Sequence, residues 1–355
     1  MAELAHLKPR FVAAGVDQSD FDVVLARTPA WDAWCQEWCR AGDRHLELAE
    51  RAEAAGHRLS AGQAFARAAA YYHFAKYLFF HDPEQYAQAL HQSVGCYRRA
   101  LPLLHPPGER LEAELDGVRM PGVLRRPLGV PQPPLVVVIP GLDATKEEMH
   151  TFGEVFLERG MATLSFDGPG QGETGTQLPI QPDYSRALAA FLDQLVDRED
   201  LDMGSIGVVG VSLGGYYAPQ AAASEPRITA AVAICGPFNW GECFPGLPPL
   251  TQAAYVYNSG APDYASAASW AHVLKLEGVA VRIRCPLLVI HAGQDRVIPA
   301  PEGRRLAQAV PGAELVVYPD GVHVCHNLTY AYRPLVADWM ADRLGEARRA
   351  TPTRA

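Results

Sequence analysis

The sequence lacks long apolar runs, paired cysteines and an excess of positive charge. No segment approaches the roughly 18 uninterrupted apolar residues that a membrane-spanning helix needs. The opening stretch MAELAHLKPR contains no apolar core of the kind found in signal peptides. The seven cysteines are odd in number and form no C-x-x-C pair. We therefore expect reduced thiols in a cytoplasmic protein with no membrane span.

The charge and composition limit the classes of partner. A net charge of −9 argues against nucleic acid or an anionic membrane as the main partner, although it also serves plain solubility. Hydrophobic residues make up 48% of the chain and charged residues 20%, which is typical of a globular protein with a large core. The 355 residues exceed the roughly 100–200 of an ordinary domain. We expect two domains, or one large α/β domain with an added piece.

The first part of the chain, up to about residue 104, has the residue spacing and composition of helices. In WDAWCQEWC (31–39), tryptophans and cysteines recur at the spacing of one helix face. The stretches 64–80 and 86–101 are rich in alanine and aromatic residues and contain few helix breakers. Their aromatic stripes can fill a core or line a pocket. We predict a helical domain over residues 1–108.

The pattern changes at HPPG (105–108). Residues 110–115 and 118–124 alternate in polarity on either side of Asp116-Gly117, which predicts a β-hairpin. The run LVVVI (135–139) is continuously apolar, as in a strand buried on both faces.

Beyond this point strands and helices alternate over the predicted second domain, residues 109–348. Strands are predicted near 135–139, 162–166, 206–210, 229–234, 286–291 and 314–318. Helices are predicted near 147–159, 184–198, 214–224, 301–309 and 330–347. This order predicts an α/β fold with a mostly parallel central sheet flanked by helices. Between about 236 and 272 the alternation lapses, which favours a short lid insertion over the mouth of the sheet.

The segment GVSLGG (210–215) raises the question of function. It follows an apolar strand and precedes a helix, and strand, Gly-x-Ser-x-Gly, helix is the pattern of a nucleophile elbow. The glycines at 210 and 214 would allow a tight turn that projects the hydroxyl of Ser212 from the sheet edge. The alternative is that Ser212 only caps the helix. Two further groups, an acid and then a histidine, follow downstream in the order that favours catalysis.

Asp295 is the candidate acid. The segment GQD (293–295) follows a predicted strand, so the carboxylate lies on a loop at the edge where open α/β sheets build their sites. Asp295 could instead cap the next helix, but Pro299 and Pro301 place the start of that helix a few residues later.

His323 is the candidate base. It follows the last predicted strand, behind Gly321, where an imidazole could reach the serine. His326 is a second histidine that could orient the loop or face the pocket. With Cys325 the pair could suggest a metal, but no fourth ligand is spaced to complete a zinc site. We expect no metal and no cofactor, and a structural role for His291.

The oxyanion-binding groups should be backbone N–H groups of Leu213, behind the nucleophile, and Leu142, in the loop after the strand 135–139. Asp143 then lies near the mouth of the site, where it could contact substrate or cap a helix starting near Lys146.

The segment DGPGQG (167–172) invites a dinucleotide-binding interpretation. It lacks the full G-x-G-x-x-G spacing, and Pro169 removes a backbone donor that a phosphate would need. We expect this loop to form part of the wall of the active site instead.

These motifs together resemble a known family. Residues from about 110 to 345 are similar to α/β-hydrolases. The segments GLDATKEE, DGPGQGE, GVSLGG and GVHVCHN, behind a helical region, resemble a narrower group that includes 2,6-dihydroxypseudooxynicotine hydrolase and fungal polyketide-shortening hydrolases. The resemblance implies a triad of Ser212, Asp295 and His323, and a helical domain that covers the site and assists dimerisation.

The resemblance also implies an activity. Members of the group cleave a carbon–carbon bond next to a ketone, so we expect a serine hydrolase that forms an acyl-enzyme on a small, aromatic or polyketide-like substrate. Candidate substrate contacts are Asp143, Phe238, Trp240 and His326, although the aromatic residues could equally be core. The alternatives are a carboxylesterase or thioesterase with the same triad, and a binding protein that has kept an inactive hydrolase fold.

Overall fold

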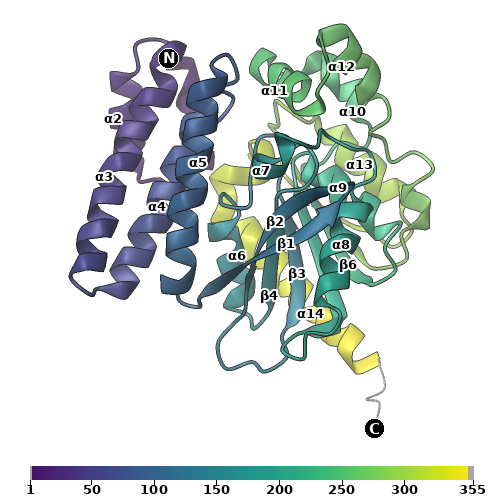
Figure 1. The fold of residues 1–355 in the computed structure, drawn as a ribbon. Coiled ribbons are helices and arrows are strands. Elements are labelled where there is room, and N and C mark those ends of the chain that lie inside the picture. Colours follow the sequence, from purple (N-terminus) through teal and green to yellow (C-terminus); the bar gives the residue numbers. More distant parts are fainter. Residues whose placement is uncertain (1, 351–355) are drawn as a thin grey trace. The chain divides into compact units, whose positions relative to one another are not determined.

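The computed structural model describes residues 2–350, whose contacts divide the chain into two compact units. The first comprises residues 1–110 with the distant segment 147–152, and the second comprises residues 111–146 and 153–355. Figure 1 labels those helices and strands of both units for which there is room. The roles of the first unit as a cap and in dimerisation stay predictions.

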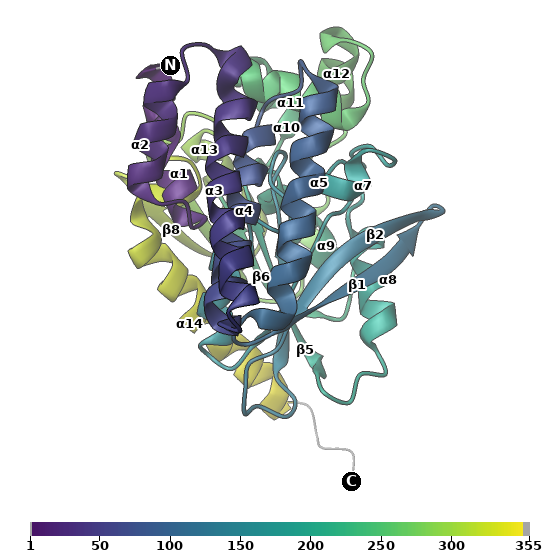
Figure 2. The ribbon, with the colours of Figure 1, turned by 60° about the vertical axis from the view of Figure 1, so that its left-hand side comes forward.

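The first unit is a layer of antiparallel helices (Figure 2). Its α-helices are α1 (Lys8–Ala13), α2 (Gln18–Arg27), α3 (Trp34–Ala54), α4 (Arg58–Lys76) and α5 (Pro83–Ala100), with short 3-10 turns at Ala2–Leu7, Trp31–Ala33 and Leu101–Leu103. The central helix α4 contacts both α3 and α5. The two short helices α1 and α2 fall within the region predicted as helical, although the sequence pattern did not give their bounds.

Aromatic side chains form the core of the helical unit. Trp34 and Trp38, one turn apart on α3, are both buried, and so is Phe74 on α4. Phe11 of α1 stacks on Phe74 with 3.7 Å between the ring centroids. These aromatic side chains therefore pack within the helical unit. Gly42 of α3 leaves room for the ring of Tyr72, because an added Cβ at position 42 would lie 2.9 Å from that ring.

A buried ion pair joins the segment 147–152 to the helices of its unit. Arg10 of α1 donates two hydrogen bonds, of 2.7 and 2.8 Å, to the carboxylate of Glu148. His73 of α4, which is fully buried, donates from Nε2 to the same carboxylate at 2.9 Å. Burial opposes ionisation of Glu148, but Arg10 and His73 hold its pKa well below the usual range. Burial, aided by the nearby charge of Lys76, lowers the pKa of His73 to about 4.

This histidine makes the stability of the helical unit pH-dependent. Because an unfolded histidine titrates near 6.5, the unfolded chain binds more protons than the folded chain between roughly pH 6.5 and 4, so acid destabilises the fold. The substitution His73→Gln keeps a donor for Glu148 and removes the titration. Between pH 7 and pH 5 we expect the wild type to lose about 2 kcal/mol of unfolding free energy relative to the variant. Urea unfolding of both proteins at the two pH values measures this difference, and a difference that does not change with pH would contradict it.

The second unit is built on an eight-stranded sheet with the order β1-β2-β4-β3-β5-β6-β7-β8. The strands are β1 (Gly108–Leu115), β2 (Val118–Arg125), β3 (Pro134–Ile139), β4 (Ala162–Phe166), β5 (Asp202–Val211), β6 (Ile228–Ile234), β7 (Leu287–Ala292) and β8 (Glu314–Tyr318). From β3 to β8 the pairing is parallel, and β2 pairs antiparallel with β4. The predicted mostly parallel sheet is confirmed.

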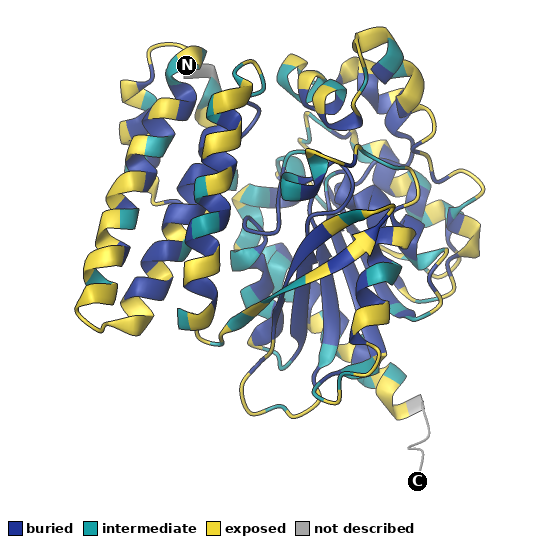
Figure 3. Ribbon diagram, viewed as in Figure 1, coloured by how far each residue is buried: buried dark blue, intermediate teal, exposed yellow. Residues whose placement is uncertain are grey.

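The hairpin at residues 110–124 is also present. Asp116 and Gly117 have φ of 51° and 78°, which are the positive values that a two-residue turn of type I′ requires. The inner strands β3, β4, β6 and β7 are almost entirely buried (Figure 3), as the continuous apolar runs of β3 and β6 predict. The edge strands β1 and β8 are largely exposed or half-buried.

Helices cover both faces of this sheet. They are α6 (His150–Leu157), α7 (Gly172–Gly175), α8 (Ser185–Leu195), α9 (Gly214–Ala222), α13 (Ala300–Ala309) and α14 (Thr329–Ala350). In Figure 1, α8 lies in front of the sheet and α14 behind it. The helix predicted from residue 147 begins three residues later, at His150, because residues 146–149 form a turn.

An insertion separates β6 from β7, as the lapse in the sequence pattern predicts. It contains α10 (Trp240–Cys243), α11 (Pro249–Ser259) and α12 (Tyr264–Ala271), with 3-10 turns at Phe244–Gly246 and Ala280–Arg282. Among residues 2–350, no helix combines the length and the apolar character that crossing a membrane requires.

Candidate active site

Ser212 lies at a sharp turn between β5 and α9. Its φ is 56°, in the left-handed region that serine rarely adopts. Two glycines make this turn possible. A Cβ at position 210 would lie 1.8 Å from the carbonyl oxygen of Gly214, and a Cβ at position 214 would lie 2.4 Å from that of Ile139. Backbone therefore occupies the space that side chains would need, and the turn presents the hydroxyl at the C-terminal edge of the sheet.

His323 connects Ser212 to Asp295. The Ser212 hydroxyl lies 2.9 Å from His323 Nε2, and His323 Nδ1 lies 2.8 Å from the nearer carboxylate oxygen of Asp295. The structure thus brings together three side chains that the sequence separates by 111 and 28 residues. With a proton on Nδ1, the imidazole donates to Asp295 and accepts the serine proton at Nε2.

The loop after β7 holds Asp295 in an ionised state. Its side chain is completely buried, and one carboxylate oxygen accepts the backbone N–H groups of Val297 and Ile298 at 2.8 and 2.9 Å. Burial opposes ionisation, but His323 and these two N–H groups outweigh it and lower the pKa of Asp295. Asp295 does not cap α13, because the N-cap position of that helix is Pro299.

The loop that carries His323 is strained and braced. Val324 and Cys325 have positive φ values of 58° and 52° directly after the histidine. The side chain of Asn327 accepts the N–H of Val322 at 2.9 Å and donates to the carbonyl of Asp320 at 2.9 Å. This brace spans the histidine and fixes the backbone on either side of it.

The other histidines of this region have different surroundings. His291 is fully buried in β7, where Nε2 donates to the carbonyl of Ile298 at 3.1 Å, and burial lowers its pKa. Within the described residues, Cys235, His291 and Asp295 are one group whose potential ligand atoms lie within 4.8 Å of one another. Because Asp295 is already bonded to His323 and two backbone N–H groups, we assign this group no metal. His326 lies on the same turn as His323, and its substrate contact stays a prediction.

The expected oxyanion donors are the N–H groups of Leu213 and Leu142, and both residues belong to segments that adjoin Ser212. Leu213 follows it, and Gly141 packs so closely against it that an added Cβ would lie 3.0 Å from Ser212 Cβ. Within residues 2–350, no protein acceptor is found for the N–H of Leu142 or of Leu213. Asp143 lies seven residues before α6, so the alternative in which it caps a helix starting near Lys146 is wrong.

A second set of residues, which the sequence analysis did not identify, holds the loop of Leu142. Lys146 donates from its backbone and from Nζ to the buried carboxylate of Asp167, at 2.9 and 2.8 Å. Gln171 donates from Nε2 to the carbonyls of Pro140 and Gly141. Asp167 and Gln171 belong to DGPGQG, the loop that the sequence predicts as part of the active-site wall, but the sequence does not show which residues this loop holds.

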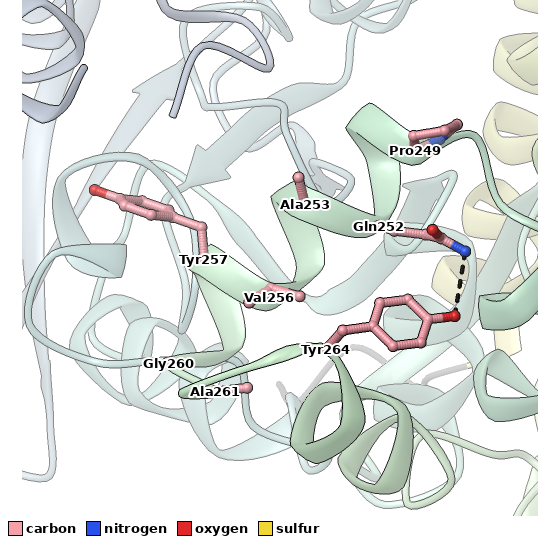
Figure 4. Close-up of a pocket in the computed structure, with 8 residues that line it drawn as sticks. All are labelled: Pro249, Gln252, Ala253, Val256, Tyr257, Gly260, Ala261 and Tyr264. Atoms are coloured by element: carbon pink, nitrogen blue, oxygen red, sulfur yellow. Dashed lines mark hydrogen bonds between the residues drawn. The ribbon is translucent and has the colours of Figure 1, made fainter. Parts of the chain in front are cut away.

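The aromatic candidates lie in the insertion. Trp240 is only 1% exposed and packs edge-on against Tyr255, and Phe238 is covered by the guanidinium of Arg305. A shallow groove of about 610 Å³ opens on α11 and the start of α12 (Figure 4). It is lined by Pro249, Gln252, Ala253, Val256, Tyr257, Gly260, Ala261 and Tyr264, and by no member of the Ser212–His323–Asp295 set. Substrate contact by Phe238 and Trp240 stays a prediction.

Family models match most of the chain. The model described as esterase FrsA-like matches residues 4–243, and that of the prolyl oligopeptidase family matches residues 151–346. Each match spans more than half of the sequence.

Individual proteins are similar over most of the chain. The 2,6-dihydropseudooxynicotine hydrolase of Paenarthrobacter nicotinovorans is 37% identical over 348 residues, which are 97% of this chain and 93% of the relative. A crystal structure of 2,6-dihydroxy-pseudo-oxynicotine hydrolase superposes with a TM-score of 0.89 at 36% identity, covering 97% of this chain and 98% of the other. The α/β-hydrolase xenA of Xenoacremonium sinensis is 32% identical over 281 residues, which are 74% of this chain and 65% of the relative.

The geometry predicts a selectively reactive serine. A fluorophosphonate should modify the peptide that contains Ser212, and Ser212→Ala should abolish this labelling. Asp295→Asn should slow labelling by roughly 10²- to 10⁴-fold, because the amide no longer holds the Nδ1-protonated tautomer of His323. Mass spectrometry of the labelled protein over time measures both effects.

The matched control is Ser224→Ala, which removes an exposed serine just beyond the end of α9 and should leave the labelling rate unchanged. Labelling of Asp295→Asn at the wild-type rate would show that the carboxylate does not support the histidine.

Proposed function

Because this chain belongs to the α/β-hydrolases, in the group described as esterase FrsA-like, we propose that it is a serine hydrolase that cleaves a carbon–carbon bond next to a ketone. The observation that carries the proposal is the continuous hydrogen-bonded series from Ser212 through His323 to the buried carboxylate of Asp295. We assign the binding of the developing negative charge to the backbone N–H groups of Leu142 and Leu213, for which no protein acceptor is found within residues 2–350.

The first half-reaction forms an acyl-enzyme. His323 Nε2 takes the proton of Ser212, and Oγ forms a bond to the carbonyl carbon of the substrate. The carbonyl π electrons move to oxygen, which Leu142 and Leu213 bind as an oxyanion. When this oxyanion collapses, the carbon–carbon bond breaks and its electron pair leaves as an enolate or phenolate-type carbanion. His323 returns the proton to this leaving group.

The second half-reaction releases the acid. Water donates a proton to His323 Nε2 and attacks the acyl carbon, and collapse of the second oxyanion expels Ser212, which recovers the proton. The fixed carboxylate of Asp295 stabilises the imidazolium that forms in both halves. Its lowered pKa keeps it anionic across the neutral range.

Two observations favour different leaving groups. The relative that is 37% identical over 97% of the chain is named as a hydrolase of 2,6-dihydropseudooxynicotine, which supports the subgroup whose members cleave carbon–carbon bonds. The matching family model is described as an esterase, which favours a carboxylesterase or thioesterase as the second candidate. The triad serves both reactions, because the stability of the leaving group decides which bond breaks.

The proposed substrate is a small molecule. A small-molecule substrate, aromatic or polyketide-like, suits the aromatic residues of the insertion, with Asp143 and His326 near the triad as candidate polar contacts. A homodimer and a cytoplasmic location remain predictions from the sequence.

Product analysis tests the proposed reaction. With benzoylacetone, a 1,3-diketone, in ¹⁸O-labelled water, we expect a carboxylic acid carrying one ¹⁸O and a ketone in equal amounts. Ser212→Ala should lower the rate by roughly 10³-fold or more. Phenyl acetate provides the ester comparison. Hydrolysis of the ester alone would favour the esterase candidate, and full activity of Ser212→Ala on both substrates would exclude a serine nucleophile.

A further inference from the structure

We propose that Gln171 is a positioning residue that aims the Leu142 N–H at the oxyanion. The inference rests on the proposed function, since it assigns a task within the same reaction. Gln171 lies in the loop between β4 and α7 and is only 2% exposed. It does not face the reacting atoms itself, and it acts through the loop that follows β3.

Every hydrogen-bonding position of the Gln171 side-chain amide is used. Its Nε2 donates to the carbonyl of Pro140 at 2.8 Å and to that of Gly141 at 3.1 Å. Its Oε1 accepts the N–H of Gly168 at 3.0 Å and the hydroxyl of Tyr184 at 2.8 Å. Two acceptor and two donor positions are the full capacity of a glutamine amide. The side chain is therefore fixed in orientation, and it presents only N–H groups to the loop after β3.

The geometry of one peptide bond explains how the contact with Gln171 sets the direction of the Leu142 N–H. The carbonyl of Gly141 and the N–H of Leu142 belong to the same planar unit, and in a trans peptide they point in opposite directions. Holding the Gly141 carbonyl towards Gln171 therefore turns the Leu142 N–H away from Gln171. Gly141 itself packs against Ser212, with 3.5 Å between the position of an added Cβ and the serine Oγ. The peptide unit of Gly141 and Leu142 therefore lies directly beside Ser212.

Other contacts fix the loop beyond that peptide, on its C-terminal side. The carbonyl of Leu142 accepts a hydrogen bond of 2.8 Å from Asn258 of α11. The buried Asp167 holds Lys146 through both backbone and side chain, and Nζ of Lys146 also reaches Glu173 at 2.7 Å. These anchors do not hold the carbonyl of Gly141, and the hydrogen bond from Gln171 to that carbonyl opposes rotation of the Gly141–Leu142 peptide unit.

A matched pair of variants distinguishes an effect on the direction of the Leu142 N–H from a general loss of protein stability. Gln171→Met keeps the length of the side chain and removes both donors to the loop. Gln220→Met is the control, because Gln220 of α9 is also a buried glutamine that donates to Asp183 and accepts the N–H groups of Tyr184 and Ser185. Both variants should lose thermal stability, whereas only Gln171→Met should disturb the oxyanion donor.

The expected result is a fall in kcat of about 10- to 100-fold for Gln171→Met with KM nearly unchanged, since the oxyanion forms only after substrate binds. The affinity for a trifluoromethyl ketone, which adds to Ser212 as a tetrahedral oxyanion, should fall by a similar factor. Gln220→Met should retain the wild-type kcat and inhibitor affinity. Both enzymes are assayed well below their melting temperatures, so a merely structural role of Gln171 would move neither readout.

The outcomes separate this inference from the proposed function. An active, fluorophosphonate-labelled wild type combined with unchanged kcat and inhibitor affinity in Gln171→Met would overturn the role of Gln171 alone. A wild type without labelling or turnover would overturn the proposed function first.

Should Gln171→Met fail to fold, Tyr184→Phe is the second variant, because it removes the hydrogen bond from the Tyr184 hydroxyl to Gln171 Oε1 and leaves both donors of Gln171 in place. It should then lower kcat and inhibitor affinity together by about 2- to 10-fold, and a wild-type result for both would count against the inference.

Discussion

The site depends on a backbone that turns through a left-handed conformation at Ser212. Such a conformation costs roughly 1–3 kcal/mol and persists only where the surroundings over-determine it. Here the close packing of β5 on the start of α9 supplies that constraint, because backbone atoms fill the space beside Gly210 and Gly214. The N–H of Ser212 is also bonded to the carbonyl of Ile234 in β6, at 2.9 Å. A relaxed turn would swing the hydroxyl away from His323.

The parallel sheet explains why residues so distant in sequence meet. Each strand from β3 to β7 ends at the same edge, so the loops after β3, β4, β5 and β7 reach one place and contribute the loop of Leu142, Gln171, Ser212 and Asp295. The loop after β8 adds His323. The chemistry therefore lies on loops, while the strands fix where each loop begins. The buried carboxylate of Asp295 stays ionised in this arrangement because His323 and two backbone N–H groups compensate for the lost water and lower its pKa.

Much of this could be predicted from the sequence, and the reasons for the gaps are physical. The apolar runs and Gly-x-Ser-x-Gly identify β5 and the elbow because few backbones tolerate that turn, and Asp116-Gly117 predicts the hairpin for the same reason. The network of Asp167, Lys146 and Gln171 was missed because its partners lie about 20 to 30 residues apart and follow no short-range period. Similarly, Arg10 and Glu148 are 138 residues apart in the sequence, so no local pattern predicts their ion pair.

The proposed reaction requires that Ser212 carries the acyl group during turnover. Rapid quenching of the enzyme with benzoylacetone, followed by mass spectrometry of the peptides, detects this intermediate. We predict a transient mass increase, equal to the acyl group of the released acid, on the peptide that contains Ser212. Turnover without any adduct on that peptide, or with the adduct on another residue, would contradict the account.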